Sequence, residues 1–224
     1  MLFDQIVSLG PTCKARYQVE RAKQATRFTT LRNSPANFPK SIFSWQITPI
    51  EAVIEGIRCD FLGMFEVEDL FVDTDGVVVN RRFGTRHVHE FPKPPRDFNI
   101  EDHYEHARGR HDHLCNLTRN ALDVAAKRTL FVFGGYSSSD RQRELSEAIA
   151  TRRAPSTFSL IFVDDTHLSP TRPGANEWAG NDPYWDAIMH PYQLRPSSPL
   201  LQRLGTMAKE QVVRLSKHFS SARF

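Results

Sequence analysis

Two short apolar runs flank an amphipathic stretch in the second half of the chain, and this pattern restricts the folds open to it. Residues 129–133 (TLFVF) and 158–163 (FSLIFV) are typical of buried strands, while residues 140–152 carry apolar positions at helical spacing. A strand, a helix and a second strand form a β-α-β unit, whose strands pair in parallel through a right-handed crossover. Because helices cover both faces of a parallel sheet, the sequence predicts an α/β fold.

Further elements are expected on both sides of this unit. The predicted strands cover residues 2–9, 77–79 and 86–91, and the predicted helices cover residues 13–25, 49–58, 101–127 and 201–219. Residues 165–199 contain six of the 14 prolines and little periodicity, so a loop is expected there. We expect one α/β domain over residues 1–224, with a central, mostly parallel sheet, flanking helices and a β-hairpin insertion.

Charge and cysteine content restrict where the chain works and what it binds. A formal net charge of +3 is too small to indicate nucleic acid as a partner. No apolar run approaches the roughly 20 residues of a membrane span, and no signal-peptide pattern precedes the first strand, so no membrane partner is expected. The cysteines at positions 13, 59 and 115 cannot all pair in disulfides, which favours a reducing, cytoplasmic location. The oligomeric state stays open.

One cysteine lies in a chemically distinctive position. Residues 6–13 (IVSLGPTC) run from a buried strand through a Gly-Pro turn to Cys13, where a helix is expected to begin. The N–H groups and the dipole of a helix N-terminus favour a thiolate over a thiol. Residues 14–32 carry six cations and a single acid, Glu20, which favours an anionic small-molecule or peptide substrate. Alternatively, Cys13 is a small apolar residue that packs between strand and helix.

Three short blocks of the sequence are similar to those of a known family. They are SLGPTC at residues 8–13, FSW at residues 43–45 and HEFP at residues 89–92. Together they resemble a bacterial family described as papain-like cysteine peptidases, which carries S-L-G-x-x-C, P-F-D-W-like and H-D-F-P-like blocks. The resemblance covers most of residues 5–135 and implies Cys13 and His89 as a catalytic pair. It also implies an α+β papain-like fold as the alternative to the α/β fold.

The group that would orient the histidine is open. A Cys-His pair needs an imidazole within hydrogen-bond reach of the thiol and usually a third polar group that orients the ring. Ser44 stands where the family has Asp, and Glu90 stands where Asp is usual. On an ideal strand Glu90 points away from His89, so Asp97 or Asn99 would have to return to the site. His87 shares a strand face with His89 and competes for the role of base.

A second histidine pattern leads to a different class of enzyme. Asp164 and His167 form an Asp-x-x-His pattern directly after the strand at residues 158–163, at the sheet edge where α/β sites lie. Flavodoxin-like esterases of the SGNH type use a late Asp-x-x-His as acid and base, with a nucleophile between the first strand and its helix. In this alternative the chain is an esterase or acyltransferase with Cys13 in the serine position.

A non-catalytic role is also compatible with the sequence. Residues 133–140 (FGGYSSSD) place glycines and hydroxyls before a helix N-terminus, as in sites that bind sugar phosphates, so a glycosyltransferase-associated domain is a further alternative. The histidine-rich residues 102–113 are expected to form a charged helix face, and neither a metal nor another cofactor is expected. Our main hypothesis is a cysteine hydrolase or acyltransferase with Cys13 as nucleophile and His89 as base.

Overall fold

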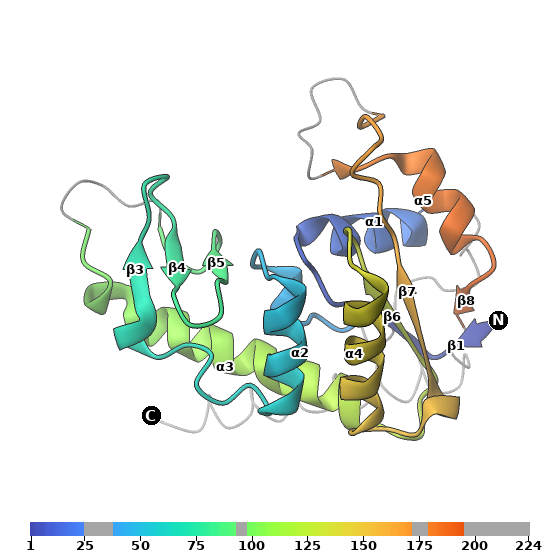
Figure 1. Cartoon of the computed structure of the whole chain (residues 1–224), viewed down its shortest axis with the longest axis horizontal. Helices are drawn as coiled ribbons and strands as arrows, with labels where there is room; N and C mark the ends of the chain where they lie inside the picture. The colour runs from blue at the N-terminus through green and yellow to red at the C-terminus, as the bar shows by residue number, and fades with distance from the viewer. Residues whose placement is uncertain (25–37, 93–97, 172–178, 195–224) are drawn as a thin grey trace, which may run out of the picture.

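The principal sheet consists of three parallel strands (Figure 1). The computed structural model describes residues 1–24, 38–92, 98–171 and 179–194. Strands β2 (Gln5–Ser8), β6 (Thr129–Phe133) and β7 (Phe158–Phe162) pair in the order β2-β6-β7, and α4 (Ser139–Ala150) connects β6 to β7. Ile6 lies opposite Leu130, and Leu130 lies opposite Ser159. The predicted β-α-β unit and the α/β class are therefore confirmed.

Each face of this sheet supplies one hydrophobic core. Successive strand residues point to opposite faces, so every continuous apolar run contributes to both cores. Val7 and Phe131 pack on one face with residues of α2, α3 and α4, whereas Ile6 and Leu130 pack on the other with residues of α1 and α5. Figure 1 shows α2 beside α4 and α1 beside α5. The bounds of these helices are Cys13–Gln24 for α1, Ile50–Arg58 for α2, Glu101–Asp123 for α3 and Asp182–Met189 for α5.

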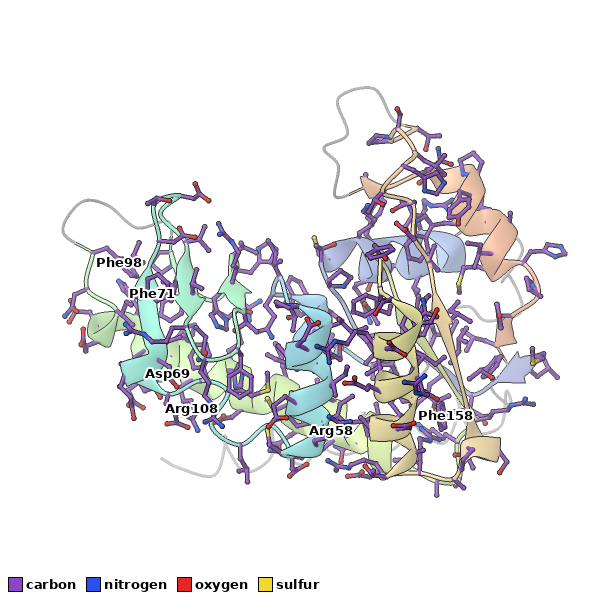
Figure 2. All side chains as sticks on the ribbon, viewed as in Figure 1. Arg58, Asp69, Phe71, Phe98, Arg108 and Phe158 are labelled. Atoms are coloured by element: carbon purple, nitrogen blue, oxygen red, sulfur yellow. The ribbon has the colours of Figure 1, made fainter. Side chains whose placement is uncertain are left out.

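A small antiparallel sheet and α3 form a third cluster. Its strands are β3 (Leu70–Val72), β4 (Val78–Asn80) and β5 (Arg86–His87), in that order. Phe65 and Phe91 pack there against Ala107 of α3, and the guanidinium of Arg108 donates a hydrogen bond to the carbonyl of Phe65 at 3.0 Å (Figure 2). The insertion thus has three strands where a hairpin was expected. β3 escapes prediction because acids interrupt the apolar pattern around it.

The strand predicted over residues 86–91 is wrong beyond its second residue. β5 ends at His87, and residues 88–90 form a turn before Pro92. His87 is 2% exposed, whereas His89 is exposed, so the two imidazoles do not share a face. The period of two that relates side chains holds only while a strand continues.

The loop predicted over residues 165–199 is also wrong in part, because it contains α5 and β8 (Gln193–Leu194). The side chain of Asn181 caps α5 by accepting the backbone N–H of Tyr184 at 3.1 Å, and Pro183 stands in the first turn, where proline is tolerated. β8 pairs in parallel with β1 (Leu2–Phe3), which a bend at Asp4 separates from β2. The helix predicted at residues 201–219 lies outside the described residues.

The other predicted helices are present with small changes at their ends. α1, α2 and α3 occupy residues 13–24, 50–58 and 101–123, in place of 13–25, 49–58 and 101–127. α2 is the most strongly amphipathic of them, with Ile50, Val53, Ile54 and Ile57 all buried in the core. Within the described part of the chain, the helices are too short or too polar to cross a membrane.

Candidate active site around Cys13

The turn that carries Cys13 lies at the carboxyl ends of β2 and β6. Gly10 adopts a φ of +89°, a conformation that favours glycine, and its carbonyl accepts the N–H of Gly134 at 2.7 Å. The ring of Pro11 lies against Gly135, where an added Cβ would come within 2.8 Å of it. Cys13 is the first residue of α1. The predicted sequence of strand, tight turn and thiol at a helix N-terminus is therefore present, at the sheet edge where α/β folds bind ligands.

The electrostatics of Cys13 differ from the expectation of a ready-made thiolate. Burial raises the pKa of the Cys13 thiol and outweighs the opposing effect of its own backbone N–H. The neighbouring cations are also engaged. Lys14 forms an ion pair with Asp165 at 2.7 Å, and Arg16 is paired with Glu20. The half-buried thiol is therefore protonated at neutral pH, and a base would have to remove its proton during a reaction.

The three blocks of the family resemblance come together in space. Ser41, just before the second block, donates a hydrogen bond from its hydroxyl to the carbonyl of Ser8. The N–H of Thr48, just after that block, donates to the carbonyl of Pro11 at 2.7 Å. Trp45 in turn meets His89 edge to face, with 5.8 Å between the ring centroids. The residues that flank the second block thus bond the segment of Cys13, and Trp45 within the block contacts His89.

His89 itself is exposed and lies in the turn after β5. Arg110 of α3 donates a hydrogen bond to its backbone carbonyl at 3.2 Å, which ties this turn to the helix. In the described part of the chain, no hydrogen bond joins the Cys13 sulfur to the ring of His87, His89 or His167. The segment around Trp45 therefore connects the two candidates indirectly: Ser41 and Thr48 bond the turn before Cys13, and Trp45 contacts the ring of His89.

His87 occupies a structural position. Its Nε2 lies 3.2 Å from the hydroxyl of Thr85, and its ring meets Phe65 edge to face at 4.8 Å. Burial, and secondarily the charge of His111, lowers the pKa of His87 to about 3. An imidazole that stays neutral and lies buried against Phe65 is not placed to take a proton from Cys13.

The proposed orienting groups lie elsewhere or serve other bonds. Glu90 is 6% exposed, and its Oε2 accepts the backbone N–H of His89 at 3.3 Å. Burial raises the pKa of Glu90 to about 7. Asn99 donates its side-chain N–H to Asp102 near the start of α3, and Asp97 lies outside the described residues. None of these contacts orients the imidazole of His89.

Ser44, the second-block residue that was compared with an aspartate, is also buried and structural. Its hydroxyl lies 2.8 Å from that of Ser41, and the N–H of Ser41 donates to it at 3.4 Å. The two serines stabilise the short 3-10 turn η3 (Ile42–Ser44), which holds the second block against β2. Ser44 therefore has a local hydrogen-bonding role that needs no charge.

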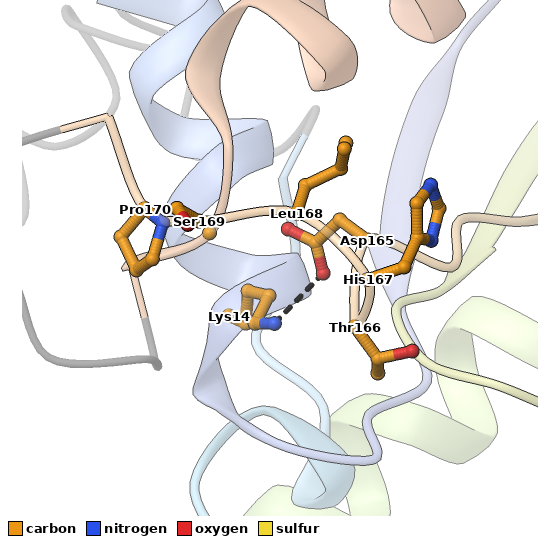
Figure 3. Close-up of a pocket in the computed structure, with 8 residues that line it drawn as sticks. Lys14, Asp165, Thr166, His167, Leu168, Ser169 and Pro170 are labelled. Atoms are coloured by element: carbon orange, nitrogen blue, oxygen red, sulfur yellow. Dashed lines mark hydrogen bonds and ion pairs between the residues drawn. The ribbon is translucent and has the colours of Figure 1, made fainter.

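A pocket of about 370 Å³ opens at Lys14, the residue after Cys13, and at the loop that follows β7 (Figure 3). The residues that line it are Lys14, Asp165, Thr166, His167, Leu168, Ser169, Pro170 and Gly180. His167, a predicted candidate, therefore shares a pocket with the residue that follows Cys13. The His167 ring meets Tyr184 edge to face at 6.0 Å.

Asp165 is the residue of this pocket that sequence reasoning missed. It is 1% exposed, and its carboxylate accepts hydrogen bonds from the Lys14 ammonium at 2.7 Å and the Trp185 indole at 2.9 Å. The N–H of Asn181 adds a third at 3.1 Å. Burial alone would raise the pKa of Asp165, but these donors outweigh it and hold the pKa below its usual value.

Asp164, the first residue of the predicted Asp-x-x-His pattern, forms a local turn instead. One carboxylate oxygen accepts both the N–H and the hydroxyl of Thr166, at 3.1 and 2.6 Å. It therefore does not orient His167. The signal that would have identified Asp165 is its position shortly after β7, at the carboxyl edge of the sheet, together with a lysine at the start of α1. The separation of 151 residues hides that pairing.

The basic stretch that suggested an anionic substrate is mostly paired where it is described. Lys14 pairs with Asp165, and Arg21 bonds Asp182 and Asp186 of α5. Among the described residues, no group of three or more His, Cys, Asp or Glu side chains is arranged to hold a metal ion. No protein-family model, curated protein or solved structure matches the chain.

Proposed function

We propose that this protein is a thiol-dependent hydrolase or acyltransferase that uses Cys13 as its nucleophile on an amide or ester. The observation that carries the proposal is the position of Cys13 as the first residue of α1, at the carboxyl edge of a parallel sheet and directly before Lys14, which lines a pocket. Nucleophiles at such an edge are open to substrate while the sheet and helix hold them rigidly.

Because burial keeps the thiol protonated, the proposed reaction begins with removal of its proton by a histidine. The imidazole accepts the proton as the sulfur forms a bond to the substrate's carbonyl carbon. The C–N or C–O bond then breaks, and the imidazolium returns the proton to the leaving group. Water or another acceptor attacks the thioester and regenerates the thiol, so hydrolysis and acyl transfer differ only in the acceptor.

We assign the role of base to His89. Its ring is exposed and lies against Trp45, in the block whose neighbouring residues hold the turn before Cys13. The resemblance to papain-like cysteine peptidases supports the same pair. The competing base is His167, because it lines the pocket next to Lys14. In that case the site resembles an SGNH-type esterase with cysteine in place of serine.

The test is turnover of p-nitrophenyl acetate and of a peptide anilide by the wild type and by matched variants. Cys13→Ser is expected to lower turnover at least about 100-fold, whereas Cys59→Ser, at the other half-buried thiol, leaves it unchanged. His89→Gln and His167→Gln separate the two bases, since only the true base costs about 100-fold. Equal turnover by Cys13→Ser and wild type contradicts the proposal and favours a binding domain.

A further inference from the structure

A second pocket, of about 250 Å³, lies on the antiparallel sheet and shares no lining residue with the pocket at Lys14 and His167. Its apolar walls come from Val77, Val78, Val88, Phe91 and Pro92, and Asp75, Gly76 and His87 complete the lining. The proposed reaction at Cys13 does not use this pocket. A cavity of roughly 150 Å³ with apolar walls already holds benzene, so this one has room for a substituted aromatic ring.

Two polar side chains line the pocket, the exposed Asp75, which pairs with Arg86, and the buried His87, whose hydrogen bonding is incomplete. Nε2 is bonded to the hydroxyl of Thr85, but Nδ1 is buried and makes no hydrogen bond within the described chain. The distance between Nδ1 and Oε2 of Glu90 is 3.9 Å, which is too long for a hydrogen bond. A buried polar atom without a partner is costly, so Nδ1 provides a driving force for ligand binding.

Glu90, whose Oε2 lies 3.9 Å from Nδ1 of His87, also has a buried polar atom without a hydrogen-bond partner. Its Oε2 accepts the N–H of His89, while its Oε1 is buried and has no hydrogen-bond partner among the described residues. In one tautomer of His87, Nδ1 is an acceptor that lacks a donor. In the other tautomer Nδ1 is a donor, and Oε1 of Glu90 is the acceptor that lacks a donor. A hydroxyl group both donates and accepts, so it satisfies either arrangement.

Aromatic rings surround this polar pair. Phe65 meets His87 edge to face at 4.8 Å and stacks with His111 at 4.5 Å, and Phe91 of the pocket wall stacks with Phe65 at 6.0 Å. Of these rings, those of His87 and Phe91 belong to residues that line the pocket, and an aromatic ligand gains from offset-stacked or edge-to-face contacts with them, beyond the gain from area burial. The pocket therefore combines an aromatic environment with one unsatisfied hydrogen-bonding position.

We propose that this pocket binds a small aromatic alcohol, with the ring between Val88 and Phe91 and the hydroxyl at His87. This binding function is independent of Cys13 and of any acyl transfer. The ligand class follows from the apolar walls, which accept a ring, and from the unpartnered Nδ1 of His87, which a hydroxyl can satisfy as donor or acceptor.

The probes for a test are p-cresol and 4-fluorotoluene, which have the same ring and size but differ in the hydroxyl. Binding is measured by calorimetry and, for the fluorinated probe, by ¹⁹F NMR. p-Cresol is expected to bind about tenfold more tightly, the effect of one net hydrogen bond. Equal affinity for the two probes, or no binding of p-cresol, overturns the proposal.

Matched variants locate the binding. Val88→Phe fills the pocket from a position that is 39% exposed, and it is expected to weaken p-cresol binding at least tenfold. Val124→Phe makes the same change at a valine that is 36% exposed at the end of α3, and it should leave affinity unchanged. His87→Phe should abolish the preference for p-cresol. If Val88→Phe and Val124→Phe bind p-cresol equally well, the ligand does not occupy this pocket.

Discussion

Replacement of Asp165 by asparagine tests the network that joins α1, the end of β7 and α5. The wild-type carboxylate is 1% exposed and accepts three hydrogen bonds, from Lys14, Trp185 and the N–H of Asn181. The amide keeps the size of the side chain but loses its charge. It also turns one acceptor into a donor, which then faces an existing donor.

The loss of stability expected for Asp165→Asn depends on the Lys14 ammonium, which stays largely buried in the variant. The Lys14 side chain is only 14% exposed, so its ammonium loses its partner without gaining full solvation. Breaking one side of a buried ion pair typically costs 3–5 kcal/mol. We therefore expect Asp165→Asn to lower the free energy of unfolding by about 3 kcal/mol. Glu20→Gln, in the more exposed pair with Arg16, should cost less than about 1 kcal/mol.

The measurement is urea unfolding followed by circular dichroism, at several pH values. The pKa of Asp165 is lower in the folded state than its ordinary value of 3.8, so its stabilisation is fully present above that value. This stabilisation is lost as the pH falls through the pKa of the folded state. The difference in free energy of unfolding between wild type and Asp165→Asn should therefore become smaller at such low pH. A variant as stable as wild type at pH 7 would refute the assignment of Asp165 as a buried charged group.

Two further predictions concern single positions. The pKa of Glu90 rises from 4.5 to about 7 on folding, so its contribution to stability falls as the pH rises through that interval. The difference in free energy of unfolding between wild type and Glu90→Gln should therefore decrease by about 3 kcal/mol from pH 4.5 to 8 in urea titrations; a constant difference would contradict the burial of this carboxyl. An added Cβ at Gly180 would lie 2.5 Å from the Asp165 carboxylate at a φ of +75°, whereas Gly76 has a φ of +72° and open space. Gly180→Ala should thus destabilise the fold by about 2 kcal/mol more than Gly76→Ala in thermal or urea unfolding, and equal effects would rule out the close contact.

Local patterns were sufficient to predict the principal sheet. The apolar runs at residues 129–133 and 158–163, separated by an amphipathic helix, leave few alternatives to two parallel strands joined by a crossover. The turn before Cys13 was predictable for the same reason, since a Gly-Pro pair after a strand ends it within a few residues. In both cases the residues that decide the structure are neighbours in sequence.

Local patterns failed where a structure depends on partners far away in the chain. β5 ends at His87 because β4 offers it only Val78 and Val79 as partners, and the turn that follows exposes His89 while His87 stays buried. α5 was missed because its main signal is one capping asparagine within a proline-rich stretch. The β-strand propensity of a residue does not tell how many residues of two strands pair. For β4 and β5 that number depends on how the third cluster packs on α3.

The surroundings of Cys13 illustrate the same division. Its place at a helix N-terminus was predicted from adjacent residues and is confirmed, but the charge state of its thiol was not. Lys14 and Asp165 are 151 positions apart, and their ion pair removes a positive charge that the sequence seemed to offer the thiol. Burial and pairing are properties of the whole tertiary structure, because each depends on which distant segment covers a residue. The sequence therefore placed the thiol on its helix, and only the packing of α5 and the end of β7 against that helix set its electrostatics.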